Sequence, residues 1–152
     1  MGSQMNFHRL SAEFYTKYGN LKEILTKEER PYYVLLLDID GLTYAIPLRS
    51  HITHQFCFIA DKSKEYASGL DYSKAVIITD SVKYIDPAPV TIRQHEYNVL
   101  KQHEHLIKRR FFSYVKSYKK EIKRINTNPS IPLSTRCQYS VLKYFHKELG
   151  LL

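Results

Sequence analysis

The 152-residue sequence has no tryptophan, only two cysteines and five glycines, and no long hydrophobic run. Cys57 and Cys137 are too few to staple a fold with disulfides or to build a four-cysteine zinc site, so we expect a protein of the reducing cytoplasm. Apolar runs such as that of Val34 to Leu37 are far shorter than the roughly 20 apolar residues that a membrane-spanning helix needs. The start also lacks the charged and apolar regions of a signal peptide.

The composition is that of a folded globular protein. Hydrophobic residues make up 43% of the chain and charged residues 25%, which excludes a disordered composition. The first four residues, Met1 to Gln4, are typical of a cloning remnant ahead of a native start at Met5. We therefore expect a single domain, with one core, over residues 5–152.

Positive charge is concentrated in one part of the chain. The formal net charge is +8, and residues 93–124 alone hold ten basic and three acidic side chains. A protein that binds a polyanion shows such a concentration, although a solvated lysine-rich helix face gives the same pattern. Thirteen tyrosines and seven phenylalanines supply surfaces on which bases can stack, but most are expected in the core.

The first part of the sequence predicts a short helix and a hairpin. Ser11 is a suitable cap for a helix that Gly19 ends. Asp40-Gly41 stands between two apolar runs and is a preferred two-residue turn, which predicts a hairpin with strands at 32–39 and 42–48. Further β-structure is expected at 55–60, at 72–79 after a turn at Gly69, and in a short piece at 82–85.

The second part predicts helices. Apolar residues from Ile92 to Ile125 recur mostly at three- and four-residue steps with bases between them, which predicts an amphipathic helix broken near Glu104. Asn126 to Pro129 ends it, and a last helix is expected from about Ser134 to Gly150. The expected fold class is α+β, with a compact, antiparallel, partly closed and barrel-like sheet on which helices pack.

The segment after the hairpin concentrates groups that can cleave RNA. Arg49, Ser50, His51, Thr53 and His54 lie within six residues. Cleavage without a metal requires a base for the 2′-hydroxyl, donors for the phosphate oxygens and an acid for the leaving 5′-oxygen. Histidine carries protons near neutral pH and arginine clamps phosphate. A polar loop whose histidines only cap backbone groups accounts for this composition at least as well.

The sequence gives less support for a metal or cofactor site than for an RNA-cleaving segment. His51 with His54, and His103 with His105, do not reproduce a zinc motif, and no carboxylates cluster with them. The hairpin turn accounts for Asp40 better than a metal site does. The phosphate-binding, dinucleotide-binding and serine-hydrolase motifs are also missing from the sequence. We expect neither a metal nor a cofactor.

Several short motifs together resemble a known family, the endoribonuclease toxins of bacterial type III toxin–antitoxin systems. They are Phe14-Tyr15-Thr16-Lys17-Tyr18, Arg30-Pro31-Tyr32, Asp38-Ile39-Asp40-Gly41 and Tyr44-Ala45-Ile46-Pro47-Leu48-Arg49-Ser50. The resemblance extends over most of the chain, including the long basic helix. Among the ToxN, AbiQ, CptN and TenpN groups, the smaller CptN or TenpN type is the most similar.

This resemblance implies a fold similar to the MazF and Kid toxins and a role in phage defence. It also implies metal-independent cleavage of target RNA that leaves a 2′,3′-cyclic phosphate. The inhibitor would be a repeated antitoxin RNA that folds as a pseudoknot and is processed by the protein itself. The two would form a closed protein–RNA assembly, for which three plus three is the commonest arrangement in such toxins.

The chain departs from the ToxN pattern at the catalytic position. The family's serine after Pro-Leu-x corresponds to Ser50, but the lysine that should follow is missing, since no lysine occurs from residue 28 to 61. Either His51 or His54 then carries the proton or the charge, or the mechanism differs from that of the family. The expected catalytic residues are Ser50, His51, Thr53 and His54. Arg30 matches a basic residue that approaches RNA in the family.

The remaining bases are expected to hold RNA phosphates. The full expected RNA-binding set is Arg30, Arg49, Lys101, His103, Lys108, Arg109, Arg110, Lys116, Lys119 and Lys120. Two other functions stay open at this point. A non-catalytic nucleic-acid-binding protein, such as a repressor, needs only the basic helix, and a metal-dependent nuclease needs ligands that the motifs do not supply.

Overall fold

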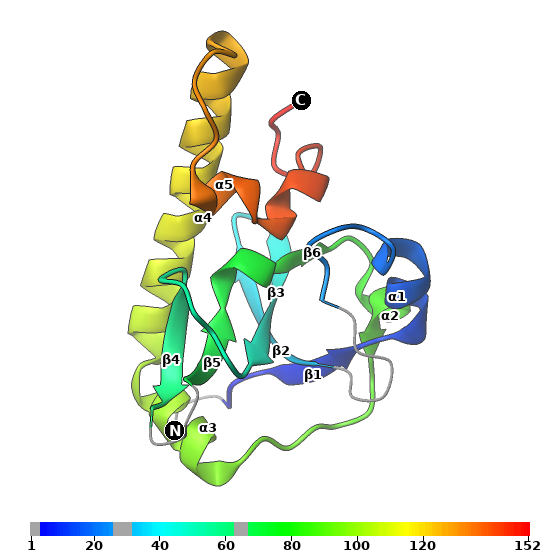
Figure 1. Cartoon of the computed structure of the whole chain (residues 1–152). Helices are drawn as coiled ribbons and strands as arrows, with labels where there is room; N and C mark the ends of the chain where they lie inside the picture. Colours follow the sequence, from blue (N-terminus) through cyan, green and yellow to red (C-terminus); the bar gives the residue numbers. More distant parts are fainter. Residues whose placement is uncertain (1–3, 26–31, 63–66) are drawn as a thin grey trace.

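Seven strands form one antiparallel sheet in the computed structural model, which describes residues 4–25, 32–62 and 67–152. They are β1 (Phe7–Leu10), β2 (Tyr33–Ile39), β3 (Leu42–Arg49), β4 (Cys57–Asp61), β5 (Ser68–Asp71), β6 (Val76–Ile78) and β7 (Ile85–Asp86). Their order is β4-β5-β3-β2-β1-β7, with β6 also paired to β3. The predicted α+β class is confirmed, but the sheet is not closed into a barrel (Figure 1).

The predicted hairpin is confirmed. Strands β2 and β3 pair from Val34–Pro47 to Ile39–Leu42. Asp40 and Gly41 both have positive φ angles, of 52° and 79°, as a two-residue turn of this hand requires. Glycine adopts this conformation freely, and aspartate tolerates it better than most residues.

The predicted strand at 72–79 is wrong in its first half. Residues Tyr72–Lys74 form a 3₁₀ helix, η1, and the side chain of Asp71 caps it by accepting a hydrogen bond from Ser73 N–H. The strands before and after η1 therefore both pair with β3. Strand β5 pairs with Leu48–Arg49, and strand β6 pairs with Thr43–Ala45. The β-propensity of residues 72–79 predicted one strand, but the helix that Asp71 caps occupies the first three of them.

Two smaller predictions are also wrong. Gly69 lies within β5 rather than in a turn, where it lets β4 approach closely, since a Cβ there would lie 2.0 Å from Phe58 O. The piece at 82–85 is mostly the short helix α2 (Ser81–Tyr84), because the Asp80 side chain caps its first turn.

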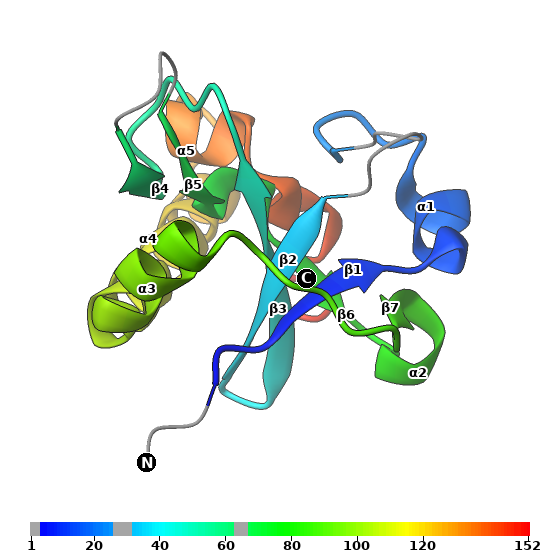
Figure 2. The same ribbon diagram turned by 90° about the horizontal axis from the view of Figure 1, so that it is seen from below.

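The helices at the start and in the second half follow the sequence pattern. Helix α1 (Ala12–Tyr18) begins after Ser11, whose Oγ accepts from Phe14 N–H, and ends at Gly19. The long amphipathic stretch consists of α3 (Gln94–Gln102) and α4 (Glu104–Thr127), separated at His103 close to the predicted break. Figure 2 shows α1 and α2 together at one end of the sheet and α3 and α4 at the other.

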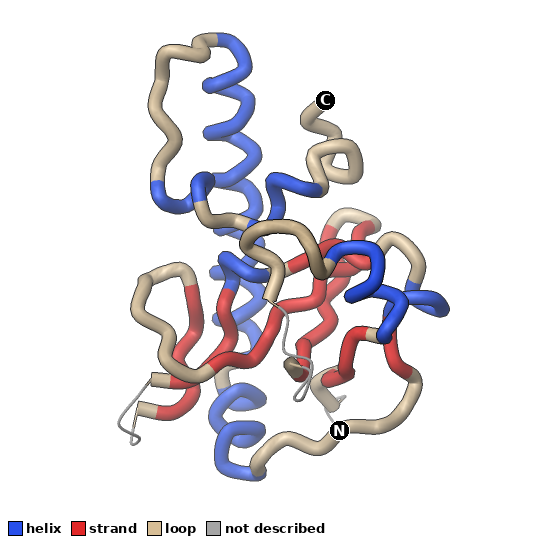
Figure 3. The backbone as a smooth tube through the Cα atoms, turned by 45° about the vertical axis from the view of Figure 1, so that its right-hand side comes forward, coloured by secondary structure: helices blue, strands red, loops and turns tan. Residues whose placement is uncertain are grey.

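The predicted last helix is two short pieces, α5 (Thr135–Gln138) and the 3₁₀ helix η2 (Val141–Tyr144). The Ser140 side chain accepts from Leu142 N–H and starts the second piece. Before α5, the chain returns alongside α4, as Figure 3 shows, and Ser134 donates to Glu121 of α4 from both its backbone N–H and its hydroxyl. The C-terminal segment therefore covers part of α4.

The core lies between α4 and the sheet. Ile107, Phe111 and Tyr118 of α4 are fully buried, and the Phe111 ring meets that of Tyr44 on β3 with centroids 5.2 Å apart. Tyr72 of η1 packs on the same ring, with centroids 5.5 Å apart. This packing fixes the end of β5 against α4, next to the loop in which the sequence places the catalytic residues.

Candidate functional site

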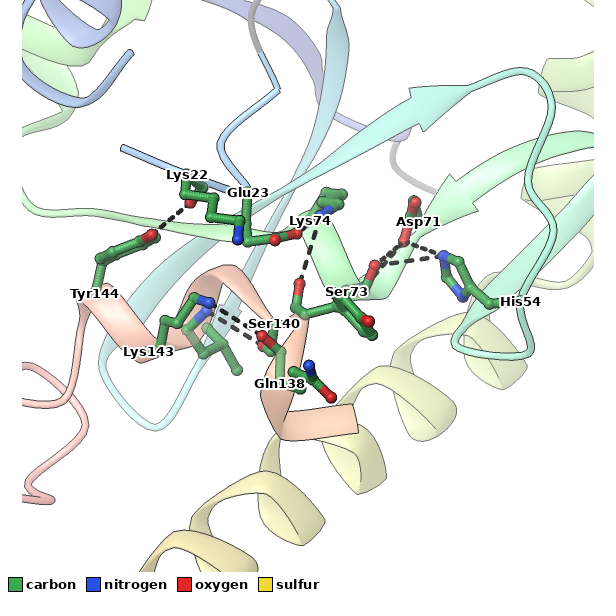
Figure 4. A network of polar contacts seen from close by, with 12 residues as sticks. Lys22, Glu23, His54, Asp71, Ser73, Lys74, Gln138, Ser140, Lys143 and Tyr144 are labelled. Carbon is green, nitrogen blue, oxygen red and sulfur yellow. Dashed lines mark hydrogen bonds and ion pairs between the residues drawn. The ribbon is translucent and has the colours of Figure 1, made fainter. Parts of the chain in front are cut away.

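A buried carboxylate organises the loop that follows β3. Asp71, the last residue of β5, is fully buried. Its Oδ2 lies 2.7 Å from Arg49 Nη1 and its Oδ1 lies 3.1 Å from His54 Nε2. The hydroxyl of Ser73 donates to Oδ1 at 2.6 Å. We call Arg49, His54, Asp71 and Ser73 the Asp71 cluster; Figure 4 shows all of it except Arg49.

The loop from Ser50 to Phe56 brings His54 to this carboxylate. Ile52 anchors it, since its side chain is buried and its N–H donates to Ala67 O at 3.2 Å. His51 has a φ angle of 61°, a left-handed conformation that costs about 1–2 kcal/mol for a residue with a Cβ. Such strain occurs preferentially at functional sites.

The hydrogen bonds of His54 define its tautomer. Nδ1 accepts from Phe56 N–H at 3.0 Å, so the proton of the neutral ring resides on Nε2 and points to Asp71. Both nitrogens therefore have protein partners, and 31% of the side chain is exposed. Only Nδ1 can become a proton acceptor, once the backbone amide of Phe56 is displaced.

The cluster is not a serine-hydrolase triad. Ser73 Oγ lies 3.4 Å from His54 Nε2, the same nitrogen that faces Asp71. A triad needs the serine and the carboxylate on different ring nitrogens, so that one holds the ring while the other gives up its proton. Ser73 also donates to Asp71, which makes its hydroxyl a support of the carboxylate rather than a nucleophile.

The structure brings together only part of the predicted catalytic set. His54 belongs to the cluster together with Arg49, which was predicted to bind phosphate. Ser50 and His51 are exposed and contact each other, with Ser50 Oγ 3.0 Å from His51 Nδ1. Thr53 is exposed on the same loop. These three lie at the surface beside the cluster and not in it.

Asp71 and Ser73 were missed by the sequence analysis. Their spacing is that of an aspartate whose side chain accepts from the backbone two residues later, and Ser73 N–H does donate to Asp71 Oδ1 at 3.0 Å. That signal was present in the sequence. It was overlooked because the apolar run that follows suggested an uninterrupted strand.

Two cavities open on either side of the cluster. Arg49 and Ser50 border one of about 250 Å³, together with Arg93, whose Nε lies 2.8 Å from Glu96 Oε1. His54 borders the other, of about 490 Å³. Asp71 therefore links a guanidinium at one opening with an imidazole at the next.

The thiols near the site are poor nucleophiles. Burial raises the pKa of Cys57, and the negative charge of Asp71 raises it further. Burial also raises the pKa of Cys137, to about 12. Both groups are therefore protonated at neutral pH, whereas the thiolate is the reactive form of cysteine. Cys57 instead donates from Sγ to His54 O at 3.2 Å and steadies the loop.

Several predicted RNA-binding residues lie on one face of α4. Lys108, Arg109, Lys116 and Lys120 are exposed and Lys119 is half-buried. With Lys123, these residues form what we call the α4 basic face. Lys116, Lys119, Lys120 and Lys123 line a cavity of about 570 Å³ between α4 and the turn of the β2–β3 hairpin. Their positive charge is available to a polyanion.

Some predicted RNA-binding residues, including Lys108 of the α4 basic face, have protein partners. Lys101 and Lys108 lie 2.8 and 3.8 Å from Glu104, and the hydrogen bond from Lys101 is the main reason why the pKa of Glu104 is lowered. His103 Nδ1 lies 2.8 Å from Val99 O at the end of α3, and its ring packs on Phe58. Arg30 lies outside the residues that the structure describes.

The α4 basic face and the Asp71 cluster lie on different sides of α4. Tyr114 packs on Phe56, next to His54, with ring centroids 6.0 Å apart. Lys116 follows two residues later, so its side chain projects about 200° away around the helix. Arg110 precedes Tyr114 by one turn and is the α4 base on the cluster side, where its charge lowers the pKa values of Cys57 and Tyr72 against the effect of burial.

Comparisons with protein-family models, curated proteins and solved structures found no match. Among the described residues, no helix combines the length and the apolar character needed to cross a membrane. Within the same residues, no three histidine, cysteine or acidic side chains are grouped so that they could hold a metal ion. What the chain does must therefore be argued from the Asp71 cluster and the distribution of its bases.

Proposed function

We propose that this chain is a metal-independent endoribonuclease of the type III toxin kind, with the Asp71 cluster at its centre. The observation that carries this proposal is that one buried carboxylate holds both Arg49 and His54, a phosphate ligand and a proton carrier, at a partly exposed surface. The substrate RNA strand would cross the Asp71 cluster from the cavity that Arg49 borders to the cavity that His54 borders.

Each group has a definite role in this reaction. The 2′-hydroxyl displaces Phe56 N–H from His54 Nδ1, gives its proton to that nitrogen and attacks the phosphorus. The imidazolium that forms is stabilised by Asp71 through Nε2, as in other carboxylate–histidine pairs. Arg49 keeps guanidinium N–H groups besides the one bound to Asp71, and these hold the phosphate oxygens.

The bond from phosphorus to the 5′-oxygen then breaks, which leaves a 2′,3′-cyclic phosphate and a 5′-hydroxyl. The leaving oxygen takes a proton from a second carrier, for which His51 at the exposed end of the same loop is the candidate. Ser50, which contacts the His51 ring at 3.0 Å, would orient it.

The regulator that we propose is a folded antitoxin RNA in a closed assembly, such as three proteins with three RNAs. The α4 basic face supports it, because it lies away from the Asp71 cluster and offers phosphate contacts beyond those that cleavage needs. The pairing of β3 with β2, β5 and β6 supports a curled sheet similar to the MazF-type barrel.

The test is cleavage of RNA in EDTA, with the ends identified by mass spectrometry. We expect cyclic phosphate ends, and a loss of about 100-fold or more in rate for His54→Ala. His95→Ala, which removes an exposed histidine from α3, is the matched control and should cleave at the wild-type rate. Wild-type activity in His54→Ala would refute the assignment of this site.

A second function, binding of nucleic acid without cleavage, is favoured by one observation. Both ring nitrogens of His54 are engaged within the protein, while the α4 basic face lines an open cavity on the other side of the helix. In the same assay, a protein with this second function would bind the RNA in a stable complex and leave it uncut. Cleavage that appears only after metal is added would instead indicate a metal-dependent nuclease.

A further inference from the structure

The cavity beside His54 has the character of a binding pocket for a flat, apolar group. It measures about 490 Å³, within the range of ligand sites in proteins. His54 and Ser73 of the Asp71 cluster form one part of its lining, and Phe56, Lys74 and Tyr139 form others. A group bound there would lie directly beside the proposed reaction centre.

Two aromatic rings border this cavity. Tyr139 follows α5 and is 48% exposed, so its ring is accessible to a ligand. Phe56 is half-buried, and the guanidinium carbon of Arg136 lies 5.7 Å from its ring centroid. Exposed aromatic rings and the planes of arginine side chains are the surfaces on which proteins stack unpaired nucleobases.

The frame of the cavity is held in place by ion pairs. Lys74 Nζ lies 2.6 Å from Glu23 Oε2, as Figure 4 shows. It also donates to Tyr139 O at 3.4 Å and so ties η1 to the segment after α5. Arg136 Nη1 lies 3.3 Å from Glu121 Oε1 of α4. Because these pairs fix the walls, the rings need little reorganisation to accept a ligand.

The charges around the cavity suit an RNA strand. Burial alone would raise the pKa of Glu121, but hydrogen bonds from Ser134 and the charge of Arg136 outweigh it and lower that pKa. The pKa of Glu23 is lowered mainly by its hydrogen bond from Lys74. Each carboxylate is therefore ionised and paired with a cation, and its negative charge is compensated where a phosphate would approach.

We propose that this cavity binds one unpaired nucleobase, stacked on the rings of Phe56 and Tyr139, next to the phosphate that Arg49 and His54 act upon. This inference rests on the proposed function and deepens it, because it names the substrate class. A paired base would first have to be flipped out of its stack, at a cost of about a few kcal/mol, so the cavity favours single-stranded RNA as the substrate. Phe56 and Tyr139 are then the residues that position the strand.

The test measures binding separately from cleavage. The probe is a mixed-sequence 2′-O-methyl RNA of about eight nucleotides, labelled with fluorescein, which has no 2′-hydroxyl and cannot be cleaved by the proposed route. Its dissociation constant is measured by anisotropy, as a single strand and as a duplex. Loss of one stacked base weakens binding by about five-fold or more, so Tyr139→Ala should do so for the single strand and leave the duplex unchanged.

Two variants serve as controls. Tyr139→Phe keeps the ring and should bind the single strand as the wild type does. Leu133→Ala removes another exposed apolar side chain just before α5, outside the cavity lining, and should also bind normally. Circular-dichroism melting checks that each variant is folded, which is expected because about half of Tyr139 is exposed.

The outcomes separate the pocket from the proposed function. Wild-type affinity in Tyr139→Ala, or equal weakening for single strand and duplex, overturns the pocket and leaves RNA cleavage standing. Weakened binding with rescue by phenylalanine, in a protein that does not cleave RNA, supports the pocket and refutes the catalytic assignment. A wild-type protein that binds no single strand refutes both.

Discussion

The imidazole of His54 points its Nε2 at the carboxylate of Asp71, 3.1 Å away, where β5 ends. The same carboxylate holds Arg49, the last residue of β3, which pairs with Gly69 of β5. A buried negative charge thus fixes two cationic or proton-carrying groups from neighbouring segments. The site depends on the pairing of β3 with β5 as much as on the loop between β3 and β4.

Replacing Asp71 with asparagine tests this arrangement. Asp71→Asn keeps the volume but removes the charge that Arg49 and His54 share, so we expect the free energy of unfolding to fall by about 1–3 kcal/mol in urea. RNA cleavage should fall by about 100-fold or more, since His54 loses the partner of its imidazolium form. Asp38→Asn is the control, because Asp38 is exposed and its Oδ1 accepts a hydrogen bond from Thr43 Oγ1 at 2.7 Å.

For Asp38→Asn we expect the free energy of unfolding to change by no more than about 0.5 kcal/mol and the rate of RNA cleavage to stay the same. If the two variants lose activity equally, the cluster has no special role. If Asp71→Asn unfolds more easily but cleaves RNA normally, the carboxylate is structural only.

The close approach of β4 to Gly69 gives a second prediction. A Cβ at this position would lie 2.0 Å from Phe58 O and 2.9 Å from Ala60 N, both backbone atoms, so Gly69→Ala must push β4 away. We expect a loss of about 2 kcal/mol or more and faster hydrogen exchange of the β4 amides. Gly41→Ala, which meets nothing within 4 Å, is strained only by its φ of 79°.

The Gly41→Ala control should therefore lose about 1–2 kcal/mol in the free energy of unfolding, and the hydrogen-exchange rates of the β4 amides should stay unchanged. Slow exchange throughout β4 in Gly69→Ala would show that the strand accommodates the methyl group, and would contradict the importance of this contact for placing the loop that carries His54.

The local parts of this fold were predictable from the sequence. The cap at Ser11, the Asp40-Gly41 turn and the break at His103 depend on residues within a few positions of each other, and all are found. The predicted strand at 72–79 begins instead with η1, because the Asp71 side chain accepts a hydrogen bond from Ser73 N–H. This cap is also a local signal, but the β-propensity of the apolar run that follows outweighed it in the prediction.

The candidate site was predictable only in part. The loop bearing His54 stood out because its polar groups are adjacent in sequence. Asp71 and Ser73 lie 17 or more residues further on and reach His54 only through the pairing of β5 with β3 and β4. Composition cannot show which strand ends meet, so the carboxylate that orders the loop was missed.

The α4 basic face predicts a particular salt dependence. Each phosphate contact on single-stranded RNA adds about −0.7 to the slope of log affinity against log salt. Removing Lys116 and Lys120 together, both exposed, should flatten the slope by about 1.4 in anisotropy titrations. Lys101→Ala is the control, because its Nζ is already 2.8 Å from Glu104 and its loss should change the slope much less. An unaltered slope in the double variant would place the RNA elsewhere.

The contact between Tyr118 and His146 predicts a pH dependence of stability. The two side chains are 2.6 Å apart, between Tyr118 Oη and His146 Nε2. Burial raises the pKa of Tyr118, so the phenol keeps its proton and is able to donate it to the ring nitrogen. Burial lowers the pKa of His146 from its usual value of 6.5. The folded state therefore favours a neutral imidazole that accepts.

The direction of this pH dependence follows from the number of protons that the folded and unfolded states bind. Below about pH 6.5 the unfolded chain takes up a proton on His146 while the folded protein resists it, so the free energy of unfolding falls as the pH drops, until the folded state also titrates. His146→Gln removes this titration and should lose less stability than the wild type between pH 7.5 and pH 5.5 in urea unfolding. Tyr118→Phe should cost about 1 kcal/mol at pH 7.5.

Exposed His95 supplies the control, since His95→Gln should keep the pH dependence of the wild type. Parallel stability curves for the wild type and His146→Gln would mean that the C-terminal segment is not held to α4 by a neutral histidine. The measurement bears on the site as well, because the same segment carries Tyr139, and its docking on α4 keeps that ring beside His54.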